Sequence, residues 1–171
     1  MKTRILISIT SLLLSTALLK PALADTNISN ARYAKMLDGL LSHSVTEVDV
    51  QQTKKMSDVI YIDAREKSEY DASHIKGAIW AGYDDFDLAR LTSLNKDQPV
   101  VVYCSVGYRS EKITEQLNKN GFSNASNLYG GIFEWVNQGE QVVNAKGETQ
   151  NVHAFNRKWG KWLTAGEKVY D

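Results

Sequence analysis

The protein is a chain of 171 residues in which 20 basic and 20 acidic side chains give a formal net charge of zero. It carries no basic run of the kind that binds nucleic acid, and it shows no internal repeat. The part of the chain that follows an apolar leader has the length of one domain.

The first 24 residues have the features of a signal peptide. Lys2 and Arg4 precede an uncharged run over residues 5–19, and Ala22 and Ala24 form a small-residue cleavage site. The run is shorter than the about 20 residues that a membrane span needs. We therefore expect cleavage after Ala24, a periplasmic protein and no stable membrane insertion; an uncleaved anchor is the alternative. Losing three basic residues would leave 17 basic and 20 acidic residues, a net charge of −3.

The first elements after the leader are a helix and two strands. An N-terminal helical segment is expected over residues 25–44, because one helical face of residues 29–42 carries Tyr33, Met36, Leu37, Leu40 and Leu41. Residues 44–48 suggest a strand, and residues 49–56 suggest a helix with Asp49 as its N-cap. The β-branched, apolar run over residues 59–65 predicts a buried strand.

Strands and helices alternate through the rest of the domain. After a polar, turn-rich segment we expect a short strand at 78–82, a helix at 84–94 and the clearest strand at 98–104. The pattern then predicts a helix over 109–120 with Gly121 as its C-cap, a strand entering a glycine turn at 125–131, and a helix ending at Gly139. An aromatic-rich extension over 143–171, including Trp159 and Trp162, is expected to pack on the core rather than to bind a ligand.

This alternation predicts a three-layer α/β/α domain with a mainly parallel sheet over residues 45–142. In such sheets, sites form beyond the carboxyl ends of the strands. Two polar residues fall there: Asp63 after "VIYI" and Cys104 after "VVVY".

Cys104 is the only cysteine in the chain. An exported protein usually uses cysteines in disulfides, and one cysteine cannot form an internal bridge. A buried, inert thiol is the ordinary alternative. Here, however, the thiol precedes a sharp turn at Gly107 and the start of a helix. Inward-facing amides and a helix N-terminus would stabilise a thiolate and an anionic group bonded to it.

Three segments of the chain resemble the single-domain rhodaneses, which are sulfurtransferases. "CSVGYR" resembles the six-residue active-site loop of that family. "DAREKSEYDASHIKGA" fits the pattern D-x-R-x-x-x-E-Y-x-x-x-H-I-x-G-A at every fixed position, and "GFSNASNLYGGIFEWVNQG" resembles the closing glycine turn and Trp helix. The resemblance covers about residues 45–142. It implies a rhodanese-like fold and a sulfurtransferase of this class, whereas export is expected from the leader.

The resemblance also implies a mechanism. Cys104 would take a sulfane sulfur from a donor such as thiosulfate, carry it as a persulfide held by loop amides, and pass it to cyanide, a thiol or a protein thiol. This is nucleophilic catalysis with a covalent intermediate. No cofactor or metal is implied, and one cysteine with three scattered histidines is a poor zinc set. Related phosphatases have five residues between Cys and Arg where this chain has four, so phosphatase or arsenate reductase activity is a distant alternative.

The other residues of the loop have more than one reading. Ser105, Val106, Gly107 and Tyr108 are expected to supply backbone amides. Arg109 would orient an anionic donor or brace the loop by bonding backbone carbonyls; we favour bracing, with some contribution to substrate binding. The loop carries no further cation, so the donor and acceptor stay open. A non-catalytic binding or redox-sensing module is the alternative function.

Residues outside the loop have mostly structural readings. Asp63 would cap the next turn or take part in the site, and Arg65, at the edge of the site, would pair with Glu69 at spacing i,i+4. His74 is expected to be a satisfied structural histidine. A turn beside the active edge is expected at Tyr129, Gly130 and Gly131.

Overall fold

The computed structural model describes residues 27–170, so the predicted leader and cleavage site lie outside the described residues. The described chain contains the helices α1 (Ala31–Leu40), α2 (Val50–Thr53), α3 (Lys67–Ala72), α4 (Tyr108–Lys119), α5 (Gly131–Asn137) and α6 (Arg157–Gly160), and the 3-10 helix η1 (Leu88–Leu91). Its strands are β1 (Glu47–Val48), β2 (Ile60–Asp63), β3 (Ile79–Trp80), β4 (Val100–Tyr103), β5 (Ala125–Leu128), β6 (Val142–Asn144), β7 (Gly147–Thr149), β8 (Asn151–His153) and β9 (Glu167–Val169). No helix in this part of the chain is long and apolar enough to span a membrane.

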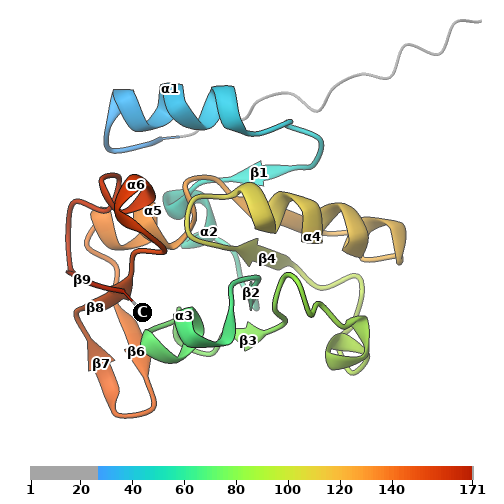
Figure 1. Cartoon of the computed structure of the whole chain (residues 1–171). Coiled ribbons are helices and arrows are strands. Elements are labelled where there is room, and N and C mark those ends of the chain that lie inside the picture. The colour runs from blue at the N-terminus through green and yellow to red at the C-terminus, as the bar shows by residue number, and fades with distance from the viewer. Residues whose placement is uncertain (1–26, 171) are drawn as a thin grey trace, which may run out of the picture.

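A five-stranded parallel sheet forms the centre of the domain, in the order β1-β5-β4-β2-β3 (Figure 1). The register pairs Asp63 with Tyr103, so β2 and β4 end side by side. Cys104 follows Tyr103 directly. The predicted α/β fold with a parallel sheet is therefore confirmed, and the carboxyl ends of its two central strands meet at one edge.

Alternate side chains of β4 enter two separate cores. Val100 and Val102 pack in a cluster with Ile113 and Leu117 of α4 and with Leu91 of η1. Val101 and Tyr103 belong to the second cluster, which contains residues of α1, α5 and the C-terminal extension. Because successive side chains of a strand point to opposite faces, the two clusters show that helices cover both faces of the sheet.

The N-terminal and C-terminal segments share one of these cores. Tyr33 and Leu37 of α1 are buried in it, together with Val152 and Leu163 of the extension. The extension adds the antiparallel pair β6–β7 and the parallel pair β8–β9. It therefore packs on the domain as expected, and Figure 1 shows α6 below one end of α1.

Several predicted elements are shorter than expected or begin at another residue; α2, for example, covers residues 50–53 of the predicted 49–56. The helix expected over residues 84–94 is only the single 3-10 turn η1, capped by Asp87, whose side chain accepts the N–H of Ala89. Leu88, Leu91 and Leu94 are spaced by three residues and all pack on the same cluster, a spacing that suits three residues per turn. Helix α4 begins one residue before the predicted start, and its C-cap is Asn120, with Gly121 in the left-handed region directly after it.

Candidate active site

Cys104 lies where β4 ends and the loop to α4 begins, and only 1% of the residue is exposed. Its Sγ accepts the N–H of Gly107 at 3.2 Å. Gly107 is the N-cap of α4 and has φ of +114°, a conformation that side-chain-bearing residues rarely adopt. The glycine therefore permits the turn that aims this amide at the sulfur. Among the described residues, no other backbone amide donates a hydrogen bond to Sγ. Of the loop amides that were predicted to face the sulfur, only that of Gly107 is therefore bonded to it.

The first residues of α5 hold the loop through hydrogen bonds to its carbonyl oxygens. The N–H groups of Ile132 and Phe133 donate to the carbonyl oxygens of Cys104 and Ser105, at 2.9 and 3.2 Å. Gly131 has φ of +58°, and a Cβ atom there would lie 2.4 Å from the Cys104 carbonyl oxygen. The predicted glycine turn therefore lies beside the loop, and its lack of a side chain allows the close approach.

A buried polar pair holds the far end of the loop. The Nδ2 group of Asn127, on β5, donates to the Gly107 carbonyl oxygen at 3.1 Å. The Ser110 hydroxyl lies 2.7 Å from Asn127 Oδ1 and 3.2 Å from the same Gly107 carbonyl. Both side chains are fully buried. Sequence reasoning did not assign them, although a polar Asn inside a strand of the core was a usable signal.

Glu69 and Arg109 form the main charged pair at the loop. The guanidinium of Arg109 donates to the two carboxylate oxygens of Glu69 at 2.6 and 2.8 Å, and to Ser105 Oγ at 3.0 Å. The Ser105 hydroxyl in turn donates to Glu69 at 3.0 Å. Arg109 thus braces the loop as predicted, but it does so through side chains rather than backbone carbonyls. Ser105 likewise contributes its hydroxyl, which was not expected.

The charges of this pair stabilise each other. Burial by itself raises the pKa of Glu69, but the hydrogen bonds and charge of Arg109 outweigh it and lower that pKa below 4.5. Burial by itself lowers the pKa of Arg109, but the hydrogen bonds that Arg109 donates to the Glu69 carboxylate outweigh burial and raise that pKa overall. Both groups are therefore ionised at neutral pH, and the arginine fork is occupied by protein atoms.

Arg65 does not pair with Glu69, which corrects the prediction from their spacing. Its Nε and Nη2 donate to the Asp63 carboxylate at 2.9 and 2.7 Å, and Nη2 also donates to the Ser73 carbonyl at 2.6 Å. The Asp63 Oδ1 atom also accepts the backbone N–H of Arg65 at 3.0 Å. Since Glu69 is already bonded to Arg109, Asp63 is the carboxylate left for Arg65. Asp63 thus caps the turn, and both residues are fully buried and outside the pocket lining.

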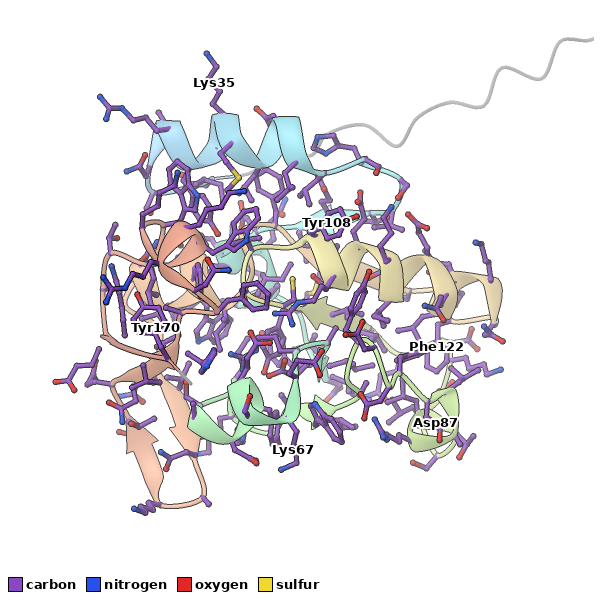
Figure 2. The ribbon with its side chains drawn as sticks, in the orientation of Figure 1. Lys35, Lys67, Asp87, Tyr108, Phe122 and Tyr170 are labelled. Atoms are coloured by element: carbon purple, nitrogen blue, oxygen red, sulfur yellow. The ribbon has the colours of Figure 1, made fainter. Side chains whose placement is uncertain are left out.

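A pocket of about 480 Å³ opens at Cys104. Its walls come from α1, the loop and the C-terminal extension: Leu40, Ser105, Val106, Tyr108, Arg109, Phe155 and Trp159. Figure 2 shows Tyr108 at the start of α4, below α1. The walls are mostly apolar, and a pocket of this size suits a small organic molecule. The extension therefore contributes directly to the candidate site.

Both tail tryptophans pack against the core as expected, and Trp159 also has a surface that the sequence did not predict to line a pocket. Trp162 stacks on Tyr33 of α1, with ring centroids 5.3 Å apart. Trp159 also packs against the core, but one side of it lines the pocket at Cys104. Sequence reasoning missed Leu40, Phe155 and Trp159 as pocket residues because nothing local in the sequence relates them to the loop.

His74 is structural, as predicted. Its Nδ1 lies 2.9 Å from the Tyr70 carbonyl oxygen, and its ring stacks on the Tyr70 ring at 3.8 Å. Within residues 27–170, no group of three or more His, Cys, Asp and Glu side chains is placed to hold a metal ion.

Comparison with known proteins places the sequence among rhodanese-like domains. The rhodanese-like domain family matches residues 46–138. Curated relatives include the tRNA uridine(34) hydroxylase of Photorhabdus laumondii subsp. laumondii, 32% identical over 97 residues, and that of Staphylococcus aureus (strain Newman), 37% identical over 93 residues. These matches cover 54% and 52% of this chain but only 28% and 29% of the relatives, so the chain spans less than a third of their length.

Solved structures show the same fold. A rhodanese-like domain from Anabaena sp. superposes with a TM-score of 0.53 at 24% identity, over 57% of this chain and 78% of that one. A rhodanese-related protein from Thermoplasma volcanium gives 0.51 at 25% identity, over 57% and 97%. The family match covers more than half of the 171 residues, and the chain therefore belongs to the rhodanese-like domain family.

Proposed function

We propose that the protein is a sulfurtransferase that carries a sulfane sulfur on Cys104. One observation carries the proposal: the Cys104 sulfur lies at a parallel strand end, accepts an amide hydrogen at 3.2 Å and lines a pocket. An inert structural thiol would not need an amide donor or access to a pocket. Four residues separate it from Arg109, the loop length of the rhodaneses that the sequence resembles.

In the first step the Cys104 thiolate attacks the outer sulfur of a donor such as thiosulfate. The S–S bond of the donor breaks, its electron pair leaves with sulfite, and a persulfide remains on Cys104. The Gly107 amide and the N-terminal end of α4 favour an anion at this position. Glu69 and Arg109 hold the loop, so the amide is in place before the reaction begins.

In the second step a nucleophilic acceptor attacks the outer sulfur of the persulfide. The S–S bond breaks again and returns its electron pair to Cys104, while cyanide becomes thiocyanate or a thiol becomes a persulfide. The chemistry needs no cofactor or metal. Separation of the two steps by a covalent intermediate predicts ping-pong kinetics.

The names of the curated relatives do not alter this proposal. The hydroxylases match this chain over less than a third of their own length. Their activity on tRNA belongs to those whole proteins, and the present chain carries no basic run for a nucleic acid.

A non-catalytic binding or redox-sensing module is the second candidate. The observation that favours it is the commitment of Arg109 to Glu69, which leaves that cation unavailable to a donor anion. Steady-state kinetics distinguish the two functions. We expect thiocyanate formation from cyanide and a sulfane donor, with parallel double-reciprocal lines, and none from Cys104→Ser. Binding of the donor without turnover would support the module instead.

The same assay set tests the reaction class. The short loop leaves less room than the phosphatase loop, so we expect no hydrolysis of aryl phosphates. Hydrolysis that disappeared in Cys104→Ser would overturn the sulfurtransferase assignment.

We also propose that the protein acts in the periplasm. The support is the sequence of residues 1–24, with its charged start, apolar run and small-residue cleavage site. N-terminal sequencing of protein from the cell envelope is expected to begin at Asp25. Recovery of the uncleaved chain in the membrane fraction would support an anchor.

A further inference from the structure

We infer that the natural sulfur acceptor is an amphipathic organic thiol, with an apolar body that lies against Phe155 and Trp159 and an anionic end that lies at Lys158 and Lys161. This inference rests on the proposed function and names the substrate class of the same site. It is built on the walls of the pocket, the state of Arg109 and an adjoining groove.

The pocket provides no free cation beside the sulfur. Both arms of the Arg109 fork bond Glu69 and Ser105, and the ring of Phe155 lies over the guanidinium with 5.0 Å between the ring centroid and Cζ. The remaining walls are mainly apolar. The part of an acceptor next to its thiol is therefore expected to be uncharged and apolar.

Phe155 is held in this place by an unusual backbone conformation. Its φ is +61°, in the left-handed region that residues other than Gly, Asn and Asp rarely adopt. The turn is closed by the N–H of Asn156, which donates to the Ala154 carbonyl oxygen at 2.7 Å. The side chain nevertheless remains 44% exposed. Burial in the core does not explain this exposed phenyl group in a rare backbone conformation. The Arg109 guanidinium contacts the ring, and the part of Phe155 that remains exposed lines the pocket, where an apolar ligand would cover it.

A second groove adjoins the pocket, and lysine side chains make it positively charged. Leu40 and Trp159 line both cavities. The second cavity, of about 370 Å³, is also lined by Lys35, Lys158 and Lys161. Lys35 projects from α1 away from the body of the protein (Figure 2), so we assign the anion to the two lysines at α6.

These two lysines have no anionic partner within residues 27–170. The ammonium groups of Lys158 and Lys161 lie over the rings of Trp159 and Trp162, at 5.7 and 4.8 Å from the ring centroids, and neither takes part in an ion pair there. From the Cys104 sulfur outward, the surface is therefore first apolar and then positively charged. A thiol with an apolar chain and a terminal carboxylate complements that order.

The transfer to such an acceptor is balanced. Its thiolate attacks the outer sulfur of the Cys104 persulfide, the S–S bond breaks, and the electron pair returns to Cys104. The acceptor leaves as an organic persulfide. No oxidant or reductant is consumed.

The test uses Cys104 loaded with inorganic polysulfide and freed of excess reagent. Loading itself is checked by intact mass, and failure to load would count against the proposed function rather than against this inference. The loaded protein is then mixed with 8-mercaptooctanoate, 3-mercaptopropionate or 8-mercapto-1-octanol, and loss of the sulfur is followed by quenched mass measurements. The same thiols reacting with free polysulfide give the intrinsic reactivity by which each rate is divided.

We expect 8-mercaptooctanoate to react at least about tenfold faster than the short acid, because its extra methylene groups are buried. It is also expected to react several-fold faster than the neutral alcohol. Phe155→Gly, which suits the left-handed backbone, and Trp159→Ala should each reduce the preference for the long chain. The double variant Lys158→Gln/Lys161→Gln should remove the preference for the carboxylate, whereas Lys146→Gln, in the β6–β7 turn, should keep it.

Three results would overturn the inference. Equal corrected rates for the long and short acids would exclude an apolar-bodied acceptor. A long-chain preference with no effect of the carboxylate would exclude the assignment of the anionic end to α6. Discharge of the persulfide by a protein thiol but by none of the three small thiols would show that the pocket serves a protein partner instead.

Discussion

Two arginine–carboxylate pairs lie at the carboxyl ends of neighbouring strands, and they differ in what surrounds them. Asp63 is the last residue of β2 and Arg65 follows it by two residues. Both side chains are completely buried, and Arg65 also donates a hydrogen bond to the Ser73 carbonyl oxygen. Arg109 and Glu69 join α4 to α3, and the side chain of Arg109 is 13% exposed at the pocket. The bond geometry of the two pairs is similar, but only the second one touches the cysteine loop, through Ser105.

This difference separates a pair that holds the fold from a pair that positions the site. A buried arginine without its carboxylate is an uncompensated charge, so the Arg65 pair should control stability. The Arg109 pair fixes a loop of six residues whose amide faces Cys104, so it should control the rate of reaction. Substitutions in the Arg65 pair are therefore expected to change mainly the stability, and substitutions in the Arg109 pair mainly the reaction rate.

The largest effect on stability is expected from removing one partner of the buried pair. Arg65→Met should lower the free energy of unfolding by about 3–5 kcal/mol, because Asp63 would remain buried and charged. The double variant Asp63→Leu/Arg65→Met should recover much of that loss. Urea denaturation measures both. If the free energy of unfolding of Arg65→Met fell by less than about 1 kcal/mol, the pair would not be important for stability.

Arg109→Lys should reduce the rate more than the stability. Lysine keeps the charge but cannot donate to both Glu69 oxygens and Ser105 in the planar arrangement of a guanidinium. The loss of one charge-assisted hydrogen bond corresponds to roughly 1.5 kcal/mol, or about tenfold in sulfur transfer at saturating donor. A raised KM with an unchanged kcat would instead mean that Arg109 binds the donor anion.

Gly131→Ala should disturb the loop through its backbone. The added Cβ would lie 2.4 Å from the Cys104 carbonyl oxygen, so the loop or α5 must shift. We expect several-fold slower transfer and a stability loss of about 1–2 kcal/mol from the left-handed conformation. Gly139→Ala is the matched control, because Gly139 has φ of +85° but open space around it. Equal rates for the two variants would argue against α5 as the support of the loop.

The smallest effect concerns the acid stability given by Glu69. A carboxylate whose pKa is lowered by folding stabilises the protein above the pKa of its unfolded state, and this contribution is lost as pH falls through the folded pKa. Glu69→Gln should therefore be less stable than the wild type at neutral pH, and the difference in stability should narrow as the pH falls below 4.5. A gap that stayed constant from pH 7 to acid would contradict an ionised Glu69 in the folded protein.

The fold and the position of the cysteine were predictable because both depend on local patterns. Alternating strands and helices indicated the parallel sheet, and the end of "VVVY" followed by Gly107 placed the thiol at its edge. The cap of α2 was also predictable, since Asp49 and Gln52 form a capping box.

The partners of the charged residues were not predictable from spacing. Arg65 and Glu69 are four residues apart, but Arg65 precedes α3 and turns back to Asp63, while Glu69 meets Arg109 from 40 positions further along. The pocket walls depend on contacts across still greater separations. Leu40 and Trp159 both line the pocket at Cys104 because α1 and the extension share one core.

The central claim is that Cys104 holds the transferred sulfur, and intact mass tests it directly. Protein treated with excess thiosulfate, 3-mercaptopyruvate or polysulfide, without acceptor, is expected to gain the mass of one sulfur atom on Cys104 with at least one of these donors. Cyanide should then remove that mass and release thiocyanate, and folded Cys104→Ser should show neither change. If none of these donors adds sulfur to the wild-type protein, Cys104 is not a sulfur carrier and the account is wrong.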